Sequence, residues 1–328
     1  LIEFLNQTNS NNSFKINVQK NHKQLVIRED ITMQIARLAS SRLLKRTRPL
    51  KLCYFGEVIR DKGSILRPER QFLQVGAECI GENSYLADIE MISLAYSALK
   101  SVGIKNISIE LSSRVFLDNL YKKIKSKKIE KIKSLIKKKD LNNVIKLTDS
   151  KHHKYIKDIF SCTGNFETKK NNLKKLKTNN INVSEINKII KIYDNIKKEN
   201  KKINFFLDLT EIDDKKYHNS VSFTIFAENV RGEIARGGRY ITKNSKFKEN
   251  ATGFTCYMDT ILRSSSKVEK NKNILIPFNT SAQLKKKLLK DNFIIETYFG
   301  NLKKLKNATI NKNYKYYLLN NKVKMINS

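Results

Sequence analysis

The stretch CYFGEVIRDKGSILRPERQFLQVGAECIG, residues 53–81, decides the interpretation of this chain. It predicts an apolar strand, then a basic loop, then a returning strand over residues 71–80. Gln74, Gly76 and Glu78 recur at every second position, so a strand would place all three on one face. A hairpin with polar groups on one face suits a pocket for a charged small molecule. A half-solvated hairpin whose polar face meets water fits the same pattern.

Length and composition exclude several classes of protein. The 328 residues are enough for one large domain or two ordinary ones, and abundant apolar residues exclude global disorder. No apolar run approaches the roughly 20 residues of a membrane helix. Four scattered cysteines without a C-x-x-C pair indicate reduced, buried thiols in a cytoplasmic protein, and we expect no metal site. The chain starts at Leu1 without a leader, so we expect an N-terminal segment to be missing.

The formal net charge of +34 would suit a nucleic-acid partner, because clustered lysines neutralise phosphates. The excess is nearly all lysine, however, and abundant asparagine and isoleucine accompany it. It is concentrated in residues 121–202 and after Lys267, without one patterned face, whereas arginine stays mostly in the motif regions. We therefore attribute the charge to biased surface composition and do not expect specific nucleic-acid binding.

Periodicity divides the chain into four segments. Residues 1–120 predict the first part of an α+β core, and residues 203–266 predict its second part, where strands return. Residues 121–202 are Lys-rich and carry Ile and Leu at helical intervals, which predicts a helical insertion, although a low-complexity tether fits parts of it. Residues 267–328 predict a small C-terminal α/β extension. The fold class is α+β on a mostly antiparallel sheet.

Several blocks of sequence carry a family resemblance. IREDITMQIAR, the hairpin and ARGGRY…ATGF resemble, in order and spacing, the catalytic core of histidyl-tRNA synthetases over about residues 1–263. KLCYFGEVIR, RPERQFLQVGAE, ADIE and YH-x-x-V-x-F are more similar still to the regulatory subunits of ATP phosphoribosyltransferase, which are synthetase paralogues that have lost tRNA charging. The resemblance implies a class II synthetase-like antiparallel sheet flanked by helices.

The two families differ in adenylation, which synthetases catalyse by positioning and charge stabilisation. By the resemblance, Arg60 matches the arginine that acts on the α-phosphate. Lys62 replaces the loop acid that binds the adenine amine, Thr260 replaces the arginine on the γ-phosphate, and Tyr257 replaces a glycine and should crowd the nucleotide pocket. Rescue by Arg263 is the alternative. The resemblance thus implies a non-catalytic chain, with no catalytic residues and no cofactor.

The amino-acid side of the pocket is retained in the resemblance, apart from Asp213, which replaces an arginine that acts on the carboxylate. An acid can receive the amino group of free L-histidine, Arg60 its carboxylate, and Gln or Glu the imidazole nitrogens. The positions that the resemblance assigns to this site are Asp30, Ile31, Thr32, Arg60, Gln74, Glu78, Tyr217 and His218.

Simpler structural roles stay open for several of these residues. Asp30 or Thr32 can cap the helix that we expect over residues 33–44. Arg60 can form a structural ion pair with Glu78.

The histidines and the paired glycines also allow simpler roles. His218 can be an ordinary core or surface histidine, and we expect His152 and His153 to face solvent. Gly237 and Gly238 fit either a backbone turn that needs a positive φ or a close approach between strands.

The resemblance implies a regulatory subunit that pairs with a short-form ATP phosphoribosyltransferase catalytic subunit. Such a subunit would be required for the first step of histidine biosynthesis and for feedback by L-histidine, and it would self-associate through its synthetase-like core. An active histidyl-tRNA synthetase or another synthetase-like ligase is the alternative. A Lys-rich RNA-binding module is a third class.

Overall fold

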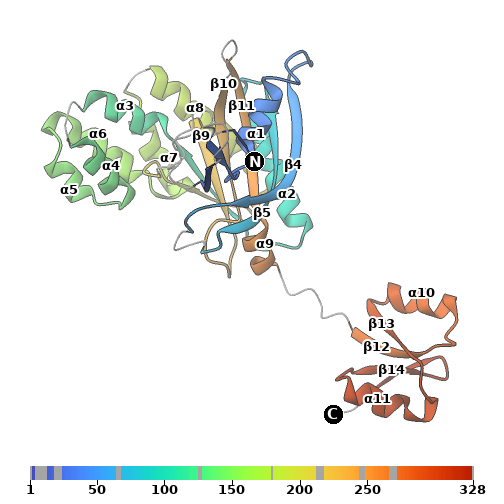
Figure 1. Ribbon diagram of the computed structural model, residues 1–328. Coiled ribbons are helices and arrows are strands. Elements are labelled where there is room, and N and C mark those ends of the chain that lie inside the picture. The colour runs from blue at the N-terminus through green and yellow to red at the C-terminus, as the bar shows by residue number, and fades with distance from the viewer. Residues whose placement is uncertain are drawn as a thin grey trace. The chain divides into compact units, whose positions relative to one another are not determined.

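The computed structural model describes residues 2–3, 13–17, 24–63, 68–124, 128–178, 180–211, 218–243, 248–265 and 272–326. The chain divides into two compact units, Leu1–Ser265 and Ser266–Ser328 (Figure 1). Two positions considered above, Asp213 and the predicted site residue Tyr217, lie outside the described residues.

A sheet of eight strands forms the centre of the first unit, in the order β4-β5-β11-β10-β9-β6-β8-β7. Its neighbouring strands are antiparallel except β6 and β8, which are parallel. The predicted α+β fold on a mostly antiparallel sheet is therefore confirmed. The strands are β4 (Leu50–Ile59), β5 (Gln71–Ile80), β6 (Ser108–Ser113), β7 (Gly164–Asn165), β8 (Asn204–Leu207), β9 (His218–Phe226), β10 (Ala235–Lys243) and β11 (Lys248–Tyr257).

The block ARGGRY lies within a strand and not in a turn, although Gly238 has a positive φ where the register with β9 shifts. It begins β10, which lies between β9 and β11 in the middle of the sheet. A Cβ atom on Gly237 would lie 2.3 Å from the carbonyl oxygen of Gly253 and 2.5 Å from the Phe223 ring. This glycine therefore permits a close approach between neighbouring elements, which was the other explanation that we considered.

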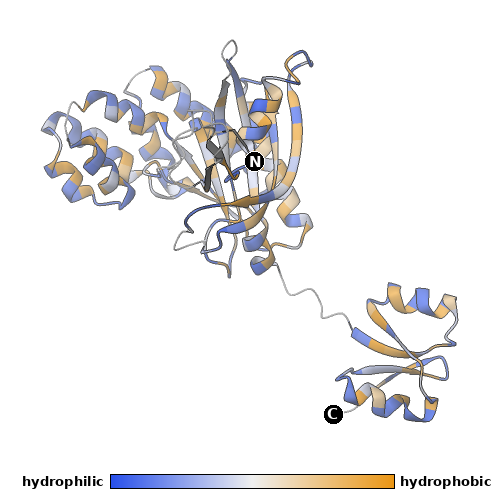
Figure 2. Cartoon of the chain, in the orientation of Figure 1, coloured by the Kyte–Doolittle hydropathy of each residue, from blue (hydrophilic) through white to orange (hydrophobic). Residues whose placement is uncertain are grey.

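The two faces of the sheet are covered by different helices. On β5, Ala77 belongs to the main hydrophobic core together with residues of α2 (Tyr85–Ser101), whereas Phe72 and Ile80 pack with residues at and before α1 (Thr32–Ala39). Because strand side chains alternate between faces, α2 lies on the core face and α1 on the opposite face. Figure 2 shows the hydrophobic residues along the central strands.

Helix α1 is shorter than the helix predicted over residues 33–44. It ends at Ala39, and turns follow it. The guanidinium of Arg48 donates hydrogen bonds to the carbonyl oxygens of Ala39, Leu43 and Arg46 at 2.8–3.2 Å. An arginine beyond the helix thus satisfies the Ala39 carbonyl, which a longer helix would have paired internally.

The Lys-rich segment is helical and shares the main core with the sheet. Its helices are α3 (Val115–Lys123), α4 (Ile129–Lys137), α5 (Leu141–Lys146), α6 (Ser150–Ser161), α7 (Phe166–Lys175) and α8 (Asn180–Glu199). Fully buried residues such as Ile136 and Ile189 join the same hydrophobic cluster as Phe223 of β9. His152 is also buried, which contradicts the expected solvent exposure.

Glu185 of α8 fastens the helical segment to the sheet. Its carboxylate accepts hydrogen bonds from Ser113 at 2.6 Å and from Ser220 at 2.8 Å. Lys188, one turn along the helix, lies 3.0 Å from this carboxylate and donates to Ser220 at 2.7 Å. The hydroxyls and the ammonium group together satisfy a carboxylate that is 4% exposed.

Short strands precede the sheet. β1 (Ile2–Glu3), β2 (Lys15–Asn17) and β3 (Gln24–Val26) form a three-stranded sheet in the order β1-β3-β2. A short helix, α9 (Met258–Ser264), follows β11 at the other end of the unit.

The second unit has a core of its own, formed by Ile274, Ile276, Leu288 and Leu318. Its sheet has the order β13-β12-β14-β15, with β12 parallel to β13 and β14. Asn320 and Asn321, both at positive φ, form the turn between β14 and β15. The elements are β12 (Lys272–Pro277), α10 (Ala282–Lys290), β13 (Phe293–Tyr298), η1 (Leu302–Lys304), α11 (Leu305–Asn311), β14 (Tyr316–Leu319) and β15 (Lys322–Met325).

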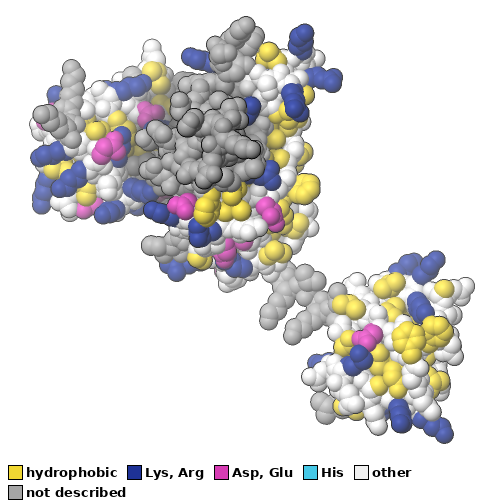
Figure 3. Space-filling view, in the orientation of Figure 1, with side chains coloured by type: hydrophobic (Ala, Val, Ile, Leu, Met, Phe, Trp, Pro, Cys, Tyr) yellow, Lys and Arg dark blue, Asp and Glu magenta, His cyan; other side chains and the backbone are white. Residues whose placement is uncertain are grey.

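The surface mixes side-chain types. In Figure 3, Lys and Arg are spread among acidic and apolar groups and do not gather in one patch. None of the helices that the structure describes combines the length and apolar character needed to cross a bilayer. Three of the four free cysteines are buried, but Cys53 is exposed on β4, so the expectation of a buried thiol was wrong there.

Candidate functional site

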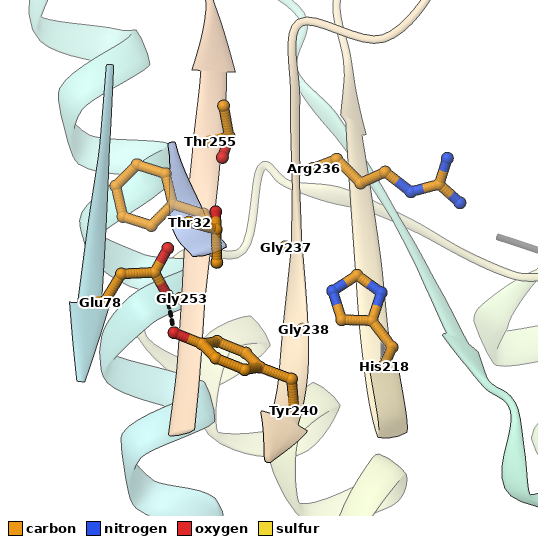
Figure 4. A pocket seen from close by; sticks show the side chains of 10 residues that line it. Thr32, Glu78, His218, Arg236, Gly237, Gly238, Tyr240, Gly253 and Thr255 are labelled. Carbon is orange, nitrogen blue, oxygen red and sulfur yellow. Dashed lines mark hydrogen bonds between the residues drawn. The ribbon is translucent and has the colours of Figure 1, made fainter. Parts of the chain in front are cut away.

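A pocket opens on the α1 face of the sheet, across β5, β11, β10 and β9 (Figure 4). Glu78 of β5 pairs with Gly253 of β11, which pairs with Gly238 of β10, so glycines form the floor beside the carboxyl group. The lining residues are Thr32, Glu78, His218, Arg236, Gly237, Gly238, Tyr240, Gly253, Phe254 and Thr255.

Glu78 is the acidic group of the pocket and is 1% exposed. Tyr240 donates to its Oε2 at 3.0 Å, and Tyr54 donates to its Oε1 at 3.3 Å. Burial, assisted by the nearby charge of Asp30 and opposed by the hydroxyl donors, raises the pKa of Glu78 from 4.5 to about 8. A cation entering the pocket would favour the ionised carboxylate, so this side suits a basic ligand.

Tyr54 connects the hairpin to the rest of the site. Its hydroxyl lies 2.6 Å from Thr255 Oγ1 and 3.2 Å from Thr32 Oγ1. The ring crosses the hairpin over Gly76, where a Cβ atom would lie 2.4 Å from the hydroxyl. Gly76, which stands in the predicted polar row of β5, therefore leaves the space that the Tyr54 side chain occupies.

The segment before α1 is tied to β5. The amide of Ile31 donates to Gln74 Oε1 at 3.1 Å, and Asp30 accepts from the amide of Thr32 at 2.9 Å. Asp30 thus satisfies one of the free amides at the start of α1, which is one of the roles that we considered. Gln74 is fully buried, and its Nε2 has no hydrogen-bond partner among the described residues.

Arg60 lies apart from the pocket lining. Its Cζ is 4.7 Å from the centroid of the Phe72 ring, and its amide donates to the carbonyl oxygen of Arg70 at 2.8 Å. Within the described part of the chain, Arg60 forms no ion pair with Glu78. Phe72 contacts Tyr257 edge-on, with ring centroids 6.0 Å apart. Arg60, Phe72 and Tyr257 therefore form one packed group at the end of the hairpin.

The residues of α9 that correspond to the γ-phosphate side of a synthetase make other contacts. Thr260 is buried, and Arg263 lies 2.5 Å from Glu69 and 3.3 Å from Asp259. Among the described residues, no three His, Cys, Asp or Glu side chains gather as a metal ion would need.

The structure brings together three of the eight predicted site residues in the pocket lining, namely Thr32, Glu78 and His218. Asp30, Ile31 and Gln74 are not in the lining but are connected to each other and to Thr32 along the chain and by hydrogen bonds. The prediction missed Arg236, Tyr240 and Tyr54, although ARGGRY and KLCYFGEVIR were both singled out as motifs.

A fourth missed residue, Arg239, explains why ARGGRY and ADIE occur together. Arg239 is 2% exposed, and its Nη2 lies 2.8 Å from Oδ2 of Asp88. It also donates to the carbonyl oxygens of Glu82 at 2.9 Å and Ser84 at 2.8 Å. The buried arginine therefore fixes the start of α2 to β10.

Comparisons with known proteins agree with this geometry. The histidyl-tRNA synthetase family model matches residues 1–261. The ATP phosphoribosyltransferase regulatory subunit of Rhodospirillum centenum is 31% identical over 270 residues, which are 82% of this chain and 69% of the relative.

Solved structures share the fold. One is an ATP phosphoribosyltransferase regulatory subunit/histidyl-tRNA synthetase from Bacillus halodurans, with a TM-score of 0.72 and 21% identity over 93% of this chain and 81% of that one. Another is a chain of the ATP phosphoribosyl transferase (HisG:HisZ) complex from Thermotoga maritima, with a TM-score of 0.60 and 18% identity over 75% of this chain and 85% of that one. The chain belongs to the ATP phosphoribosyltransferase regulatory subunit family, among the histidyl-tRNA synthetase-like proteins.

Proposed function

We propose that this chain is the non-catalytic regulatory subunit of an ATP phosphoribosyltransferase and that it senses L-histidine in the Glu78 pocket. It pairs with a short-form catalytic subunit, which converts ATP and phosphoribosyl pyrophosphate to phosphoribosyl-ATP and pyrophosphate. Family membership supports the role. The observation that carries the sensing proposal is a buried carboxyl group with two tyrosine donors beside an open glycine floor.

The part of the site that would bind ATP in a synthetase lacks the groups that adenylation needs. Tyr257 pairs with Gln74 across β11 and β5, and its ring packs on Phe72, so side chains fill the place beside the hairpin arginine. Thr260 carries no charge for a triphosphate. Arg263 is already paired with Glu69 and Asp259 and does not replace the missing cation. Without that stabilisation of charge, adenylate formation is lost.

A pocket that binds an amino acid without activating it can act as a sensor. Histidine shifts the complex toward an inhibited state only to the extent that it binds that state more tightly. Coupling free energies of this kind are typically about 1–3 kcal/mol, which corresponds to about 5- to 150-fold in affinity.

Reconstitution tests the proposal. The purified chain, mixed with a short-form catalytic subunit, is expected to accelerate phosphoribosyl-ATP formation and to make it inhibitable by histidine. Glu78→Ala is expected to remove the inhibition and keep the acceleration. Glu57→Ala is the matched control, because Glu57 is an exposed acid on the same hairpin. The proposal fails if the chain neither binds the catalytic subunit nor changes its rate.

ATP–pyrophosphate exchange with histidine separates this proposal from the alternative, an active synthetase. We expect no exchange above background, and robust exchange would favour the synthetase.

We also propose that the chain self-associates through its synthetase-like core. β4 is the edge strand of the described sheet, and on the face that α2 covers elsewhere Phe55 is 79% exposed beside Val75, which is 36% exposed. An apolar pair at an open edge favours burial against a second copy. Phe55→Lys should lower the mass measured by light scattering, and an unchanged mass would place the contact elsewhere.

A further inference from the structure

The pocket has a cationic wall opposite Glu78. Arg236 of β10 and His218 of β9 line it, and in Figure 4 both lie on the other side of Gly253 from Glu78, with the Arg236 side chain extending away from Glu78. Two strand spacings separate β5 from β10, and adjacent strands are about 4.8 Å apart, so the backbones that carry Glu78 and Arg236 are about 10 Å apart across the sheet. Gly253 and Gly238 carry no side chain, and Tyr240 reaches across from β10 to donate to Glu78.

Arg236 is held at the border of the pocket by an exchangeable partner. Its Nη2 lies 2.7 Å from Oε1 of Glu211, and the two side chains are 23% and 36% exposed. Partly exposed ion pairs are weak, so a ligand carboxylate can compete with Glu211. A guanidinium binds a carboxylate through two parallel hydrogen bonds, which gives both affinity and orientation.

His218 extends this wall. It pairs with Tyr240 of β10 and is 6% exposed. An imidazole in either protonation state has a ring N–H that can donate to a carboxylate oxygen. The family resemblance assigns the carboxylate to Arg60, but that guanidinium lies over Phe72, away from the pocket lining.

We propose that Arg236, with His218 beside it, binds the carboxylate of the effector, while Glu78 and Tyr240 bind its basic end. This rests on the proposed function, because it assigns an orientation and a ligand class to the same pocket. The ligand is a free basic amino acid, and the pocket discriminates against amines and alcohols that lack the carboxylate.

Calorimetric titration of the full chain with L-histidine and with L-histidinol, which has an alcohol in place of the carboxylate, tests the proposal. We expect the wild type to prefer histidine by at least about tenfold. Arg236→Gln should weaken histidine binding about 10- to 100-fold, as expected for a charge-assisted pair, and leave histidinol binding nearly unchanged. Arg231→Gln, at an exposed position five residues earlier, is the matched control and should change neither affinity.

Two further variants keep the test decisive if Arg236→Gln does not fold. Glu211→Gln removes the competing carboxylate and should strengthen histidine binding several-fold. Arg60→Gln should preserve the ratio of histidine to histidinol affinity. The assignment is overturned if Arg60→Gln collapses that ratio, or if Glu211→Gln and a folded Arg236→Gln leave it unchanged. If the wild type binds neither ligand, the sensing role itself fails, which distinguishes the two failures.

Discussion

The buried carboxyl group of Glu78 should make the fold less stable as pH rises, which is unusual for an acid. Its pKa is about 8 in the folded chain and 4.5 when exposed. Between these values the folded state binds a proton that the unfolded state has lost. Since stability changes with pH in proportion to protons bound in the unfolded state minus those bound in the folded state, it falls across this window.

The magnitude follows from the shift. Each pKa unit corresponds to about 1.4 kcal/mol, so this one group should lower the free energy of unfolding by about 3–4 kcal/mol between pH 5 and pH 8. Glu78→Gln removes the titration but keeps a polar group that can accept from Tyr240 and Tyr54. The variant should therefore show a decline smaller by that amount.

Urea unfolding followed by circular dichroism provides the assay, because the chain has no tryptophan. Glu110, whose pKa is raised by burial to about 7, also contributes to the decline, but equally in both proteins. The difference between wild type and Glu78→Gln thus isolates Glu78. Parallel curves from pH 5 to pH 8 would refute the reasoning, since Glu78 would then be ionised throughout that range.

Three other substitutions test the packing by urea unfolding and histidine titration. Arg239→Met should cost about 3–5 kcal/mol, because it leaves Asp88 buried without its cation, and adding Asp88→Leu should recover most of the loss. Gly253→Ala should weaken histidine binding at least about tenfold, since its Cβ would lie 1.8 Å from Glu78 Oε2; unchanged affinity would contradict the site. Ile136→Ala should cost about 2–5 kcal/mol, and a much smaller loss would mean that the insertion packs loosely.

The local sequence pattern correctly predicted those elements in which one face is buried and the other is not. Strand β5 was predicted with its observed bounds, because alternation fixes a strand with one buried face. The end of α1 and the course of β10 were missed for a different reason. Arg48 reaches back to Ala39, and Gly237 faces a carbonyl 16 residues further along, so each depends on contacts that no local window contains.

From local pattern alone the site was predictable only within one strand, whereas Thr32 and His218 were assigned to it by the family resemblance. Period two placed Gln74 and Glu78 on one face, but nothing in the sequence indicates that β10 lies two strands away and that its Arg236 lines the same pocket. Arg239 likewise meets an acid 151 positions earlier in the chain. Both arginines belong to the block ARGGRY, which was recognised as a motif. What they contact depends on the order of the strands in the sheet, and that order cannot be inferred from the block alone.

One strand supports the proposed sensing of an amino acid without its activation. Along the pocket face of β11, Gly253 and Thr255 lie beside Glu78 and leave room, whereas Tyr257 lies beside Gln74 and fills the space next to Phe72. In a synthetase, binding energy lowers the barrier to adenylation only if it is larger in the transition state. In the proposed function no transition state forms here, so ligand affinity is available to bias the assembly. Opening the nucleotide side with Tyr257→Gly therefore should not restore exchange while Thr260 lacks a charge.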